Sequence, residues 1–178
     1  VAEGKIIVEK LAGGGDISIP ITILNGQNEG PCFWINGGIH GDEPEGILTC
    51  SLLKKRVDPK KLSGSIILVP VINVPAMEAA ERGNPLDTFS YDMNRIYPGR
   101  ENGYLSERIA YVHKEWMIKF ADMEISIHSG GSHSYLAEAM FAATDYKTQE
   151  LARAMGEDWR VCLYSNVTSK SPMAVMSE

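Results

Sequence analysis

Residues 32–46 read CFWINGGIHGDEPEG. The apolar run at its start is typical of a short buried strand, and the two glycines that follow allow the backbone to turn sharply. Pro44 suits the first turn of a helix, which we expect to run to about Arg56. The stretch therefore predicts a strand, a glycine-rich turn and a helix in direct succession.

The glycine-rich turn carries two side chains that suit a metal ion. His40 and Glu43 lie three residues apart, and the glycines around them leave both side chains accessible. An imidazole nitrogen and a carboxylate oxygen are ligands of catalytic zinc sites that keep one position open for water. The alternative is a loop histidine that is merely hydrogen-bonded. A third ligand further along the chain would favour a metal-dependent hydrolase.

The sequence on either side of the turn predicts further elements. Residues 17–24 alternate like a strand, and Pro20 within them favours an edge position or a bulge. Residues 65–71 are almost all apolar, as in a strand covered on both faces. The inner face of the helix after Pro44 is expected to hold Ile47, Leu48, Leu52 and Leu53.

Regular periodicity is lost between Asn73 and Gly103, where prolines and glycines recur. Loops of this length inside compact domains are either functional or disordered. An ordered loop is expected here, because it contains side chains able to pack: Tyr91, Met93, Ile96 and Tyr97.

A second helix and more strands follow this loop. The helix is expected over residues 104–120, with His113 partly exposed. Its inner stripe would comprise Leu105, Ile109, Val112, Trp116 and Phe120. Residues 123–128 alternate like a strand and end on His128. Later elements are expected as strands at 139–143 and 161–163 and helices at 146–156 and 171–178.

Strands that alternate with helices indicate an α/β fold with a mixed, mostly parallel central sheet flanked by helices. In such sheets the functional site lies at the carboxyl ends of strands. His40 and His128 both follow such ends, so we expect them to meet in space. His40, Glu43 and His128 are thus the candidate metal ligands, whereas His133 could lie at the rim of the site or be an ordinary loop histidine.

Composition limits the partners of the chain. Its 178 residues suit one domain, and a net charge of −6 offers no basic stripe for nucleic acid or an anionic membrane. No apolar run is long enough to span a bilayer. The three cysteines are widely spaced and odd in number, which favours a reducing, cytoplasmic location over a disulfide framework. Cys32 and Cys50 are expected as small core residues.

The irregular loop also supplies cations. Arg82 and the pair Asn94-Arg95 are candidates, because a guanidinium grips carboxylates bidentately and can polarise a carbonyl. An arginine in a polar loop is otherwise a solvated surface charge.

Four ordered motifs together resemble the succinylglutamate desuccinylase/aspartoacylase family of zinc carboxypeptidase-like hydrolases. They are residues 37–46, residues 73–76 with Arg82, residues 92–99, and the strand that ends at His128. The resemblance implies a zinc carboxypeptidase-like fold and one zinc ion held by His40, Glu43 and His128. It also implies that Arg82 polarises the scissile carbonyl and stabilises the oxyanion, and that Asn94 and Arg95 bind the substrate carboxylate.

Two features depart from the family pattern. Ser126 stands where the family commonly has an aspartate, two residues before the last histidine ligand, and a serine carries no charge with which to enrich that imidazole. The family's general-base glutamate is expected beyond Glu178. Residues 1–178 are therefore expected to form a single zinc-hydrolase domain, incomplete at its C-terminus and lacking the family's smaller β-rich part.

The expected function is removal of an acyl group from an N-acylated amino acid or amine by a zinc-dependent amidohydrolase, with a homo-oligomer as one possible assembly. Two alternatives stay open. One is a zinc carboxypeptidase acting on peptides, which also pairs an asparagine with an arginine for a carboxylate. The other is a metal- or ligand-binding domain without catalysis.

Overall fold

The computed structural model describes residues 1–88, 92–136, 138–164 and 172. Its strands are β1 (Ala2–Lys10), β2 (Asp16–Asn25), β3 (Asn28–Asn36), β4 (Ser63–Val69), β5 (Met123–Ser126), β6 (Ala139–Ala143) and β7 (Arg160–Tyr164). Its helices are α1 (Glu45–Arg56), α2 (Val74–Ala79), α3 (Leu105–Phe120) and α4 (Tyr146–Ala154), with short 3-10 turns at Pro59–Lys61 and Met93–Arg95.

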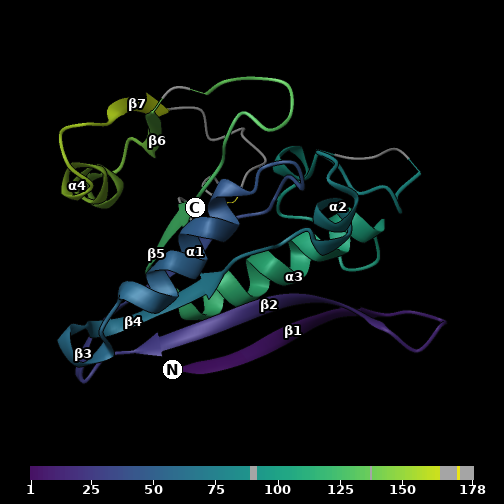
Figure 1. The fold of residues 1–178 in the computed structure, drawn as a ribbon, viewed down its shortest axis with the longest axis horizontal. Helices are drawn as coiled ribbons and strands as arrows, with labels where there is room; N and C mark the ends of the chain where they lie inside the picture. Colours follow the sequence, from purple (N-terminus) through teal and green to yellow (C-terminus); the bar gives the residue numbers. More distant parts are fainter. Residues whose placement is uncertain (89–91, 137, 165–171, 173–178) are drawn as a thin grey trace.

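Five strands form the central sheet in the order β1-β2-β4-β3-β5 (Figure 1). The β1–β2 and β2–β4 pairs are antiparallel, whereas β4–β3 and β3–β5 are parallel. The strands β6 and β7 form a separate parallel pair. The mixed α/β architecture predicted from the sequence is confirmed.

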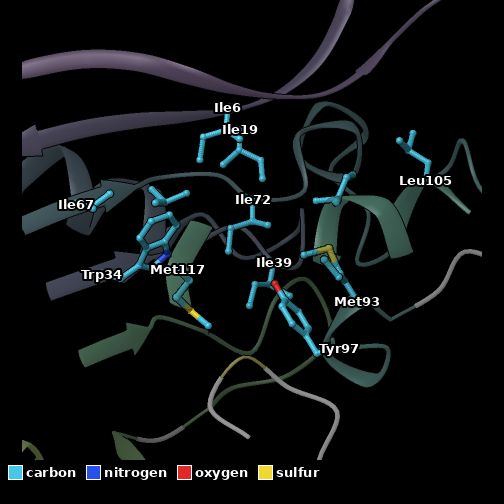
Figure 2. Close-up of a cluster of buried hydrophobic side chains, with 13 residues drawn as sticks. Ile6, Ile19, Trp34, Ile39, Ile67, Ile72, Met93, Tyr97, Leu105 and Met117 are labelled. Atoms are coloured by element: carbon cyan, nitrogen blue, oxygen red, sulfur yellow. The ribbon is translucent and has the colours of Figure 1, made fainter. Parts of the chain in front are cut away.

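The sheet is covered on both faces by separate apolar clusters. Trp34 and Ile67 point to the face that contacts α3, while their neighbours Ile35 and Leu68 point to the face that contacts α1. Figure 2 shows the first cluster, where Trp34 lies near Met117 of α3. The expectation of a strand buried on both faces is therefore confirmed for β4.

Close backbone contact sets the rotation of α1 on the sheet. A Cβ atom at Gly46 would lie 2.7 Å from the Cα atom of Gly37, so the first turn of the helix packs directly on the chain after β3. This contact turns Gly46 and Cys50 inward and leaves Leu48 and Leu52 largely exposed. The predicted inner face was wrong for these two leucines. The helix packs on the backbone at Gly37, and this close contact requires Gly46, not a larger side chain, on its inner face.

The first strand corrects the interpretation of Pro20. β1 pairs with β2 along most of its length, so β2 is an interior strand, and the register shift lies in β1 between Ile7 and Glu9. The β2–β4 ladder begins only at Thr22, beyond the proline. Pro20 is thus tolerated where pairing on one side of the strand has not begun.

Helix α3 is rotated relative to the predicted stripe. Leu105 and Ile109 are buried as expected, but Trp116 and Phe120 are exposed over two fifths of their surface and Met117 is fully buried. His113 is also fully buried, contrary to the expected partial exposure. It accepts a hydrogen bond from Trp34 Nε1 at 2.9 Å, and its Nδ1 atom lies 2.6 Å from the Tyr97 hydroxyl oxygen. These two partners explain how the ring tolerates burial.

The expected ordered loop at residues 73–103 contains one helix that sequence periodicity missed, α2. Met93 and Tyr97 are buried in the α3-facing core, as predicted, while Tyr91 lies outside the described residues. The helix expected at 171–178 also lies outside them, apart from residue 172. Among the described helices, none has the length and apolar character needed to cross a bilayer.

The burial of His113 predicts a pH-dependent stability. Burial lowers the pKa of this imidazole to about 3, whereas in the unfolded chain it titrates near 6.5. Between these pH values the unfolded state binds the extra proton, so folding is disfavoured as pH falls, by about 1.4 kcal/mol per pH unit. The comparison is with His113→Gln, which cannot titrate. Urea unfolding of both proteins from pH 7 to pH 4 should show the steeper loss in the wild type. If the free energy of unfolding fell equally with pH in both proteins, a neutral buried His113 would be contradicted.

Candidate metal centre

The two turns that carry the candidate ligands lie at one edge of the sheet. β3 and β5 are neighbouring parallel strands, and their last residues, Asn36 and Ser126, are paired in register. His40 and Glu43 follow β3, and His128 follows β5, so parallel pairing brings the three residues together. Their ligand atoms all lie within 4.8 Å of one another. The predicted meeting of His40 and His128 occurs, with their ring centroids 5.0 Å apart.

Glycines allow the first turn to fit against its neighbours. A Cβ atom at Gly41 would lie 2.0 Å from the backbone carbonyl of Ala76 in α2, and the Gly41 N–H donates to the carbonyl oxygen of Glu81. The turn is thus held between α1 and α2, with His40 before this contact and Glu43 after it.

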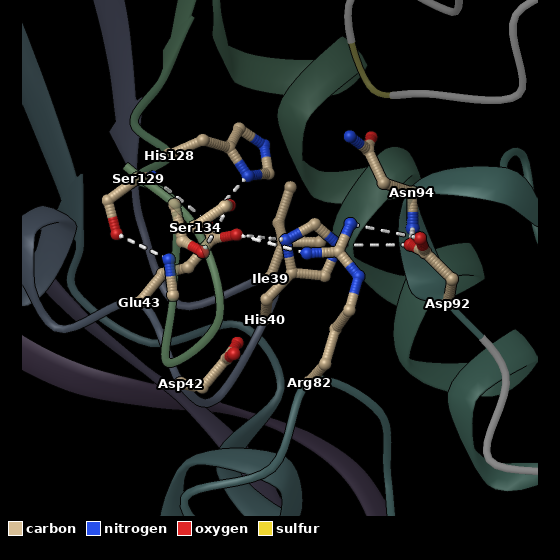
Figure 3. A network of polar contacts seen from close by, with 12 residues as sticks. Ile39, His40, Asp42, Glu43, Arg82, Asp92, Asn94, His128, Ser129 and Ser134 are labelled. Atoms are coloured by element: carbon tan, nitrogen blue, oxygen red, sulfur yellow. Dashed lines mark hydrogen bonds and ion pairs between the residues drawn. The ribbon is translucent and has the colours of Figure 1, made fainter. Parts of the chain in front are cut away.

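Glu43 lies at the centre of the cluster (Figure 3). Its side chain is only 3% exposed. Oε1 lies 2.8 Å from His40 Nδ1 and accepts from Arg82 Nη1 at 3.2 Å. Oε2 lies 2.9 Å from His128 Nδ1 and accepts from the backbone N–H of Ser129 at 3.1 Å. Burial raises the pKa of Glu43, but the hydrogen bonds with the two histidines outweigh it and hold that pKa well below its usual range.

Asp92 forms a second layer behind His40. Its Oδ1 atom lies 2.9 Å from His40 Nε2 and accepts from the backbone N–H of Asn94, and its Oδ2 atom accepts from Arg82 Nη2 at 3.1 Å. Burial raises the pKa of Asp92, while its contacts with His40 and Arg82 outweigh burial and keep it ionised. Burial lowers the pKa of His40, but the bonds to Asp92 and Glu43 outweigh it and the net shift is upward.

The donor chemistry of the cluster fits a cation. An ionised Asp92 only accepts hydrogen bonds, so His40 carries its proton on Nε2 and, when neutral, turns the Nδ1 lone pair toward the carboxylate of Glu43. His128 Nδ1 faces the other oxygen of the same carboxylate. Two imidazole nitrogens and an acceptor-only carboxylate converge, an arrangement that a shared positive charge stabilises. A His, Glu, His set of this kind is suited to zinc.

The remaining predicted residues take different positions. Arg82 is half exposed and bridges Glu43 and Asp92. Asn94 lies beside Asp92 in Figure 3, and its buried Oδ1 atom has no hydrogen-bond partner among the described residues. Arg95 is exposed, and its guanidinium donates to the Asn94 carbonyl oxygen rather than to the cluster. His133 is exposed on the loop after His128.

Two further carboxylates belong to the site, and one of them, Asp92, had no role of its own in the sequence-based prediction. Asp92 stands two residues before Asn94 within a quoted motif, and its position before a short turn was the signal available for it. Asp42 accepts from both the backbone N–H and the hydroxyl of Ser132, and so ties the loop after His128 to the first turn. Both carboxylates support the cluster from outside it.

A family comparison matches residues 29–176 to the catalytic domain of the succinylglutamate desuccinylase/aspartoacylase family. A curated relative, N-alpha-acetyl-L-2,4-diaminobutyric acid deacetylase of Halomonas elongata, is 36% identical over 117 residues, which cover 66% of this chain and 33% of the relative.

Solved structures are also similar to this chain. An aspartoacylase family protein of Mesorhizobium loti is 31% identical with a TM-score of 0.72, and the match covers 86% of this chain and 48% of that one. The product-bound ectoine utilization protein EutE of Ruegeria pomeroyi is 25% identical with a TM-score of 0.75, and the match covers 97% of this chain and 54% of that one. The chain therefore spans about a third of the curated relative and about half of these solved relatives.

The contact at Gly41 predicts a sharp steric effect. In Gly41→Ala the new methyl group meets the Ala76 backbone, so the turn or α2 has to move, and we expect a loss of about 1–3 kcal/mol or more in the free energy of unfolding. Gly13→Ala is the matched control, because no atom lies within 4 Å of a Cβ atom built there. Urea unfolding measures the free energy of unfolding of both variants. Equal stability of the two variants would contradict the close packing.

Proposed function

The chain belongs to the succinylglutamate desuccinylase/aspartoacylase family, and on that premise we propose that it carries the zinc site of a hydrolase that removes an acyl group from an N-acylated amino acid or amine. The convergence of His40, Glu43 and His128 is the observation that carries the proposal. The deacetylase name of the curated relative supports the same substrate class.

In this proposal His40 and His128 hold zinc through Nδ1 and Glu43 holds it through its carboxylate. When bound, zinc acidifies water toward neutral pH and polarises a carbonyl group. Asp92 fixes the His40 ring from its far side, because the Nε2–H donates to it. A carboxylate in this position orients an imidazole and makes it a stronger ligand.

Arg82 is proposed to stabilise the oxyanion that forms when the scissile carbonyl is attacked. Two of its N–H groups hold Glu43 and Asp92, and its half-exposed guanidinium has others left for a substrate oxygen. Asn94 and Arg95 are proposed to bind the substrate carboxylate. The NH₂ group of the Asn94 side-chain amide and the exposed guanidinium of Arg95 are the donors that a carboxylate requires.

Activity, substrate and assembly are proposed for the whole protein, because the chain spans only part of its relatives. We propose that residues 1–178 act as one domain, that the substrate is a small molecule, and that neither nucleic acid nor membrane is a partner. A cytoplasmic location is supported by the cysteines Cys32, Cys50 and Cys162, which are all free. Homo-oligomerisation stays a prediction.

Elemental analysis tests the metal ligands. The purified wild-type chain should carry about one zinc ion, and His40→Ala should lose it, because the variant lacks one of three protein ligands. His133→Ala is the matched control, since it removes an exposed histidine from the loop after His128 and should retain zinc. Full zinc occupancy in His40→Ala would contradict the ligand assignment.

A substrate panel tests the reaction class. The purified whole protein is assayed for release of free amine from N-acyl amino acids and from peptides with free or blocked C-termini. We expect turnover of the N-acyl amino acids, with kcat reduced about 100-fold or more in Arg82→Ala, where an oxyanion donor is lost. Turnover confined to peptides with a free C-terminus would favour the carboxypeptidase alternative. Zinc binding without any turnover would favour a binding domain.

A further inference from the structure

The imidazole of His128 has a second contact on the side away from Glu43. Its Nε2 atom lies 3.3 Å from the hydroxyl oxygen of Ser126 at the end of β5. The Ser126 hydroxyl in turn donates to Asn36 Oδ1 at 2.9 Å, and Asn36 Nδ2 donates to Glu124 Oε1 at 2.7 Å. A continuous line of hydrogen bonds therefore runs from His128 along the ends of two strands to a carboxyl group.

The direction of these bonds follows from the carboxyl end of the line. The Asn36 amide turns its NH₂ group toward Glu124, whose ionised form only accepts, and its oxygen toward Ser126. Burial raises the pKa of Glu124 to about 7, so the ionised form predominates above neutral pH. Ser126 has one proton and gives it to that oxygen. Its own oxygen then faces His128 Nε2 as an acceptor, which favours the proton on Nε2 and leaves the lone pair on Nδ1.

The burial of Asn36 indicates that this series of hydrogen bonds has a definite direction and does not arise by chance packing. This amide is fully buried on a central strand, where an unpaired polar group would be costly, and both of its ends are bonded. Flipping the amide would place its oxygen against the carboxylate of Glu124. The strand pairing of Asn36 with Ser126 fixes the distance between them.

We propose that Ser126, Asn36 and Glu124 form a relay that positions His128 as an Nδ1 ligand, replacing the direct aspartate that the family commonly places at residue 126. The proposal rests on the proposed metal site. All three are positioning residues, since they act on the metal only through His128. The relay supplies the Nε2 acceptor through a neutral hydroxyl and places the carboxyl group three hydrogen bonds from the imidazole.

The test measures the zinc dissociation constant by competition with a chromophoric chelator. Ser126→Ala should weaken zinc binding by about 10–100-fold, the usual effect of losing a group behind a ligand. Ser126→Thr keeps the hydroxyl and should retain the wild-type affinity, and Ser126→Asp should match or exceed it. Ser65→Ala is the matched control, because it removes a half-buried strand hydroxyl from β4 beside Cys32, at the opposite end of the sheet.

Glu124→Gln examines the end of the relay. The glutamine oxygen can still accept from Asn36, so at pH 8, above the Glu124 pKa of about 7, the substitution removes only the charge. We expect a smaller loss of zinc affinity than in Ser126→Ala. The zinc-loaded wild type should also show a slowly exchanging His128 Nε2–H proton resonance that disappears in Ser126→Ala. A merely structural role for Ser126 would not move this signal. Urea unfolding of the metal-free variants confirms that they fold.

The outcomes separate the two proposals. If the wild type binds zinc and Ser126→Ala binds it equally well, the relay is overturned while the metal site stands. If Glu124→Gln alone has no effect, the role given to Glu124 is overturned. If the wild type binds no zinc, the proposed site and the relay fail together. Should Ser126→Ala not fold, a zinc affinity of Glu124→Gln equal to that of the wild type would overturn the full relay.

Discussion

The burial of Glu43 is the constraint around which the site is built. A carboxylate that is almost inaccessible to water is stable only when charged or polar groups replace the lost hydration. Those groups come from three separate parts of the chain: His40 from the same turn, Arg82 from the segment after α2, and His128 with the Ser129 N–H from the loop after β5. Folding the central sheet and ionising this carboxylate are therefore coupled events.

Backbone packing decides how accurately these parts meet. The direct contacts Gly37–Gly46 and Gly41–Ala76 bring α1 and α2 closer to the turn than any side chain would permit. Because β3 and β5 are parallel neighbours, the register of Asn36 with Ser126 then fixes the position of His128 relative to His40 along the strand direction. The site consequently depends on glycines and strand pairing as much as on its charged residues.

Much of this arrangement could be predicted from the sequence. The strand, turn and helix around His40, and the second strand before His128, follow from local patterns, so the convergence of the two turns could be anticipated. Helix faces were less predictable, because Leu48 and Trp116 are apolar yet face outward where backbone or Met117 fills the contact instead. The burial of His113 also escaped prediction, since its partners Trp34 and Tyr97 are far from it in sequence.

Arg82 is held by two carboxylates before any ligand arrives. An arginine side chain free in solvent loses about 2 kcal/mol of rotamer entropy when it is immobilised. Here the ion pairs with Glu43 and Asp92 already restrict the guanidinium, although half of the side chain remains exposed. Much of that entropy is lost when the protein folds, so an oxygen that binds to the free N–H groups of Arg82 meets a donor whose direction is already set.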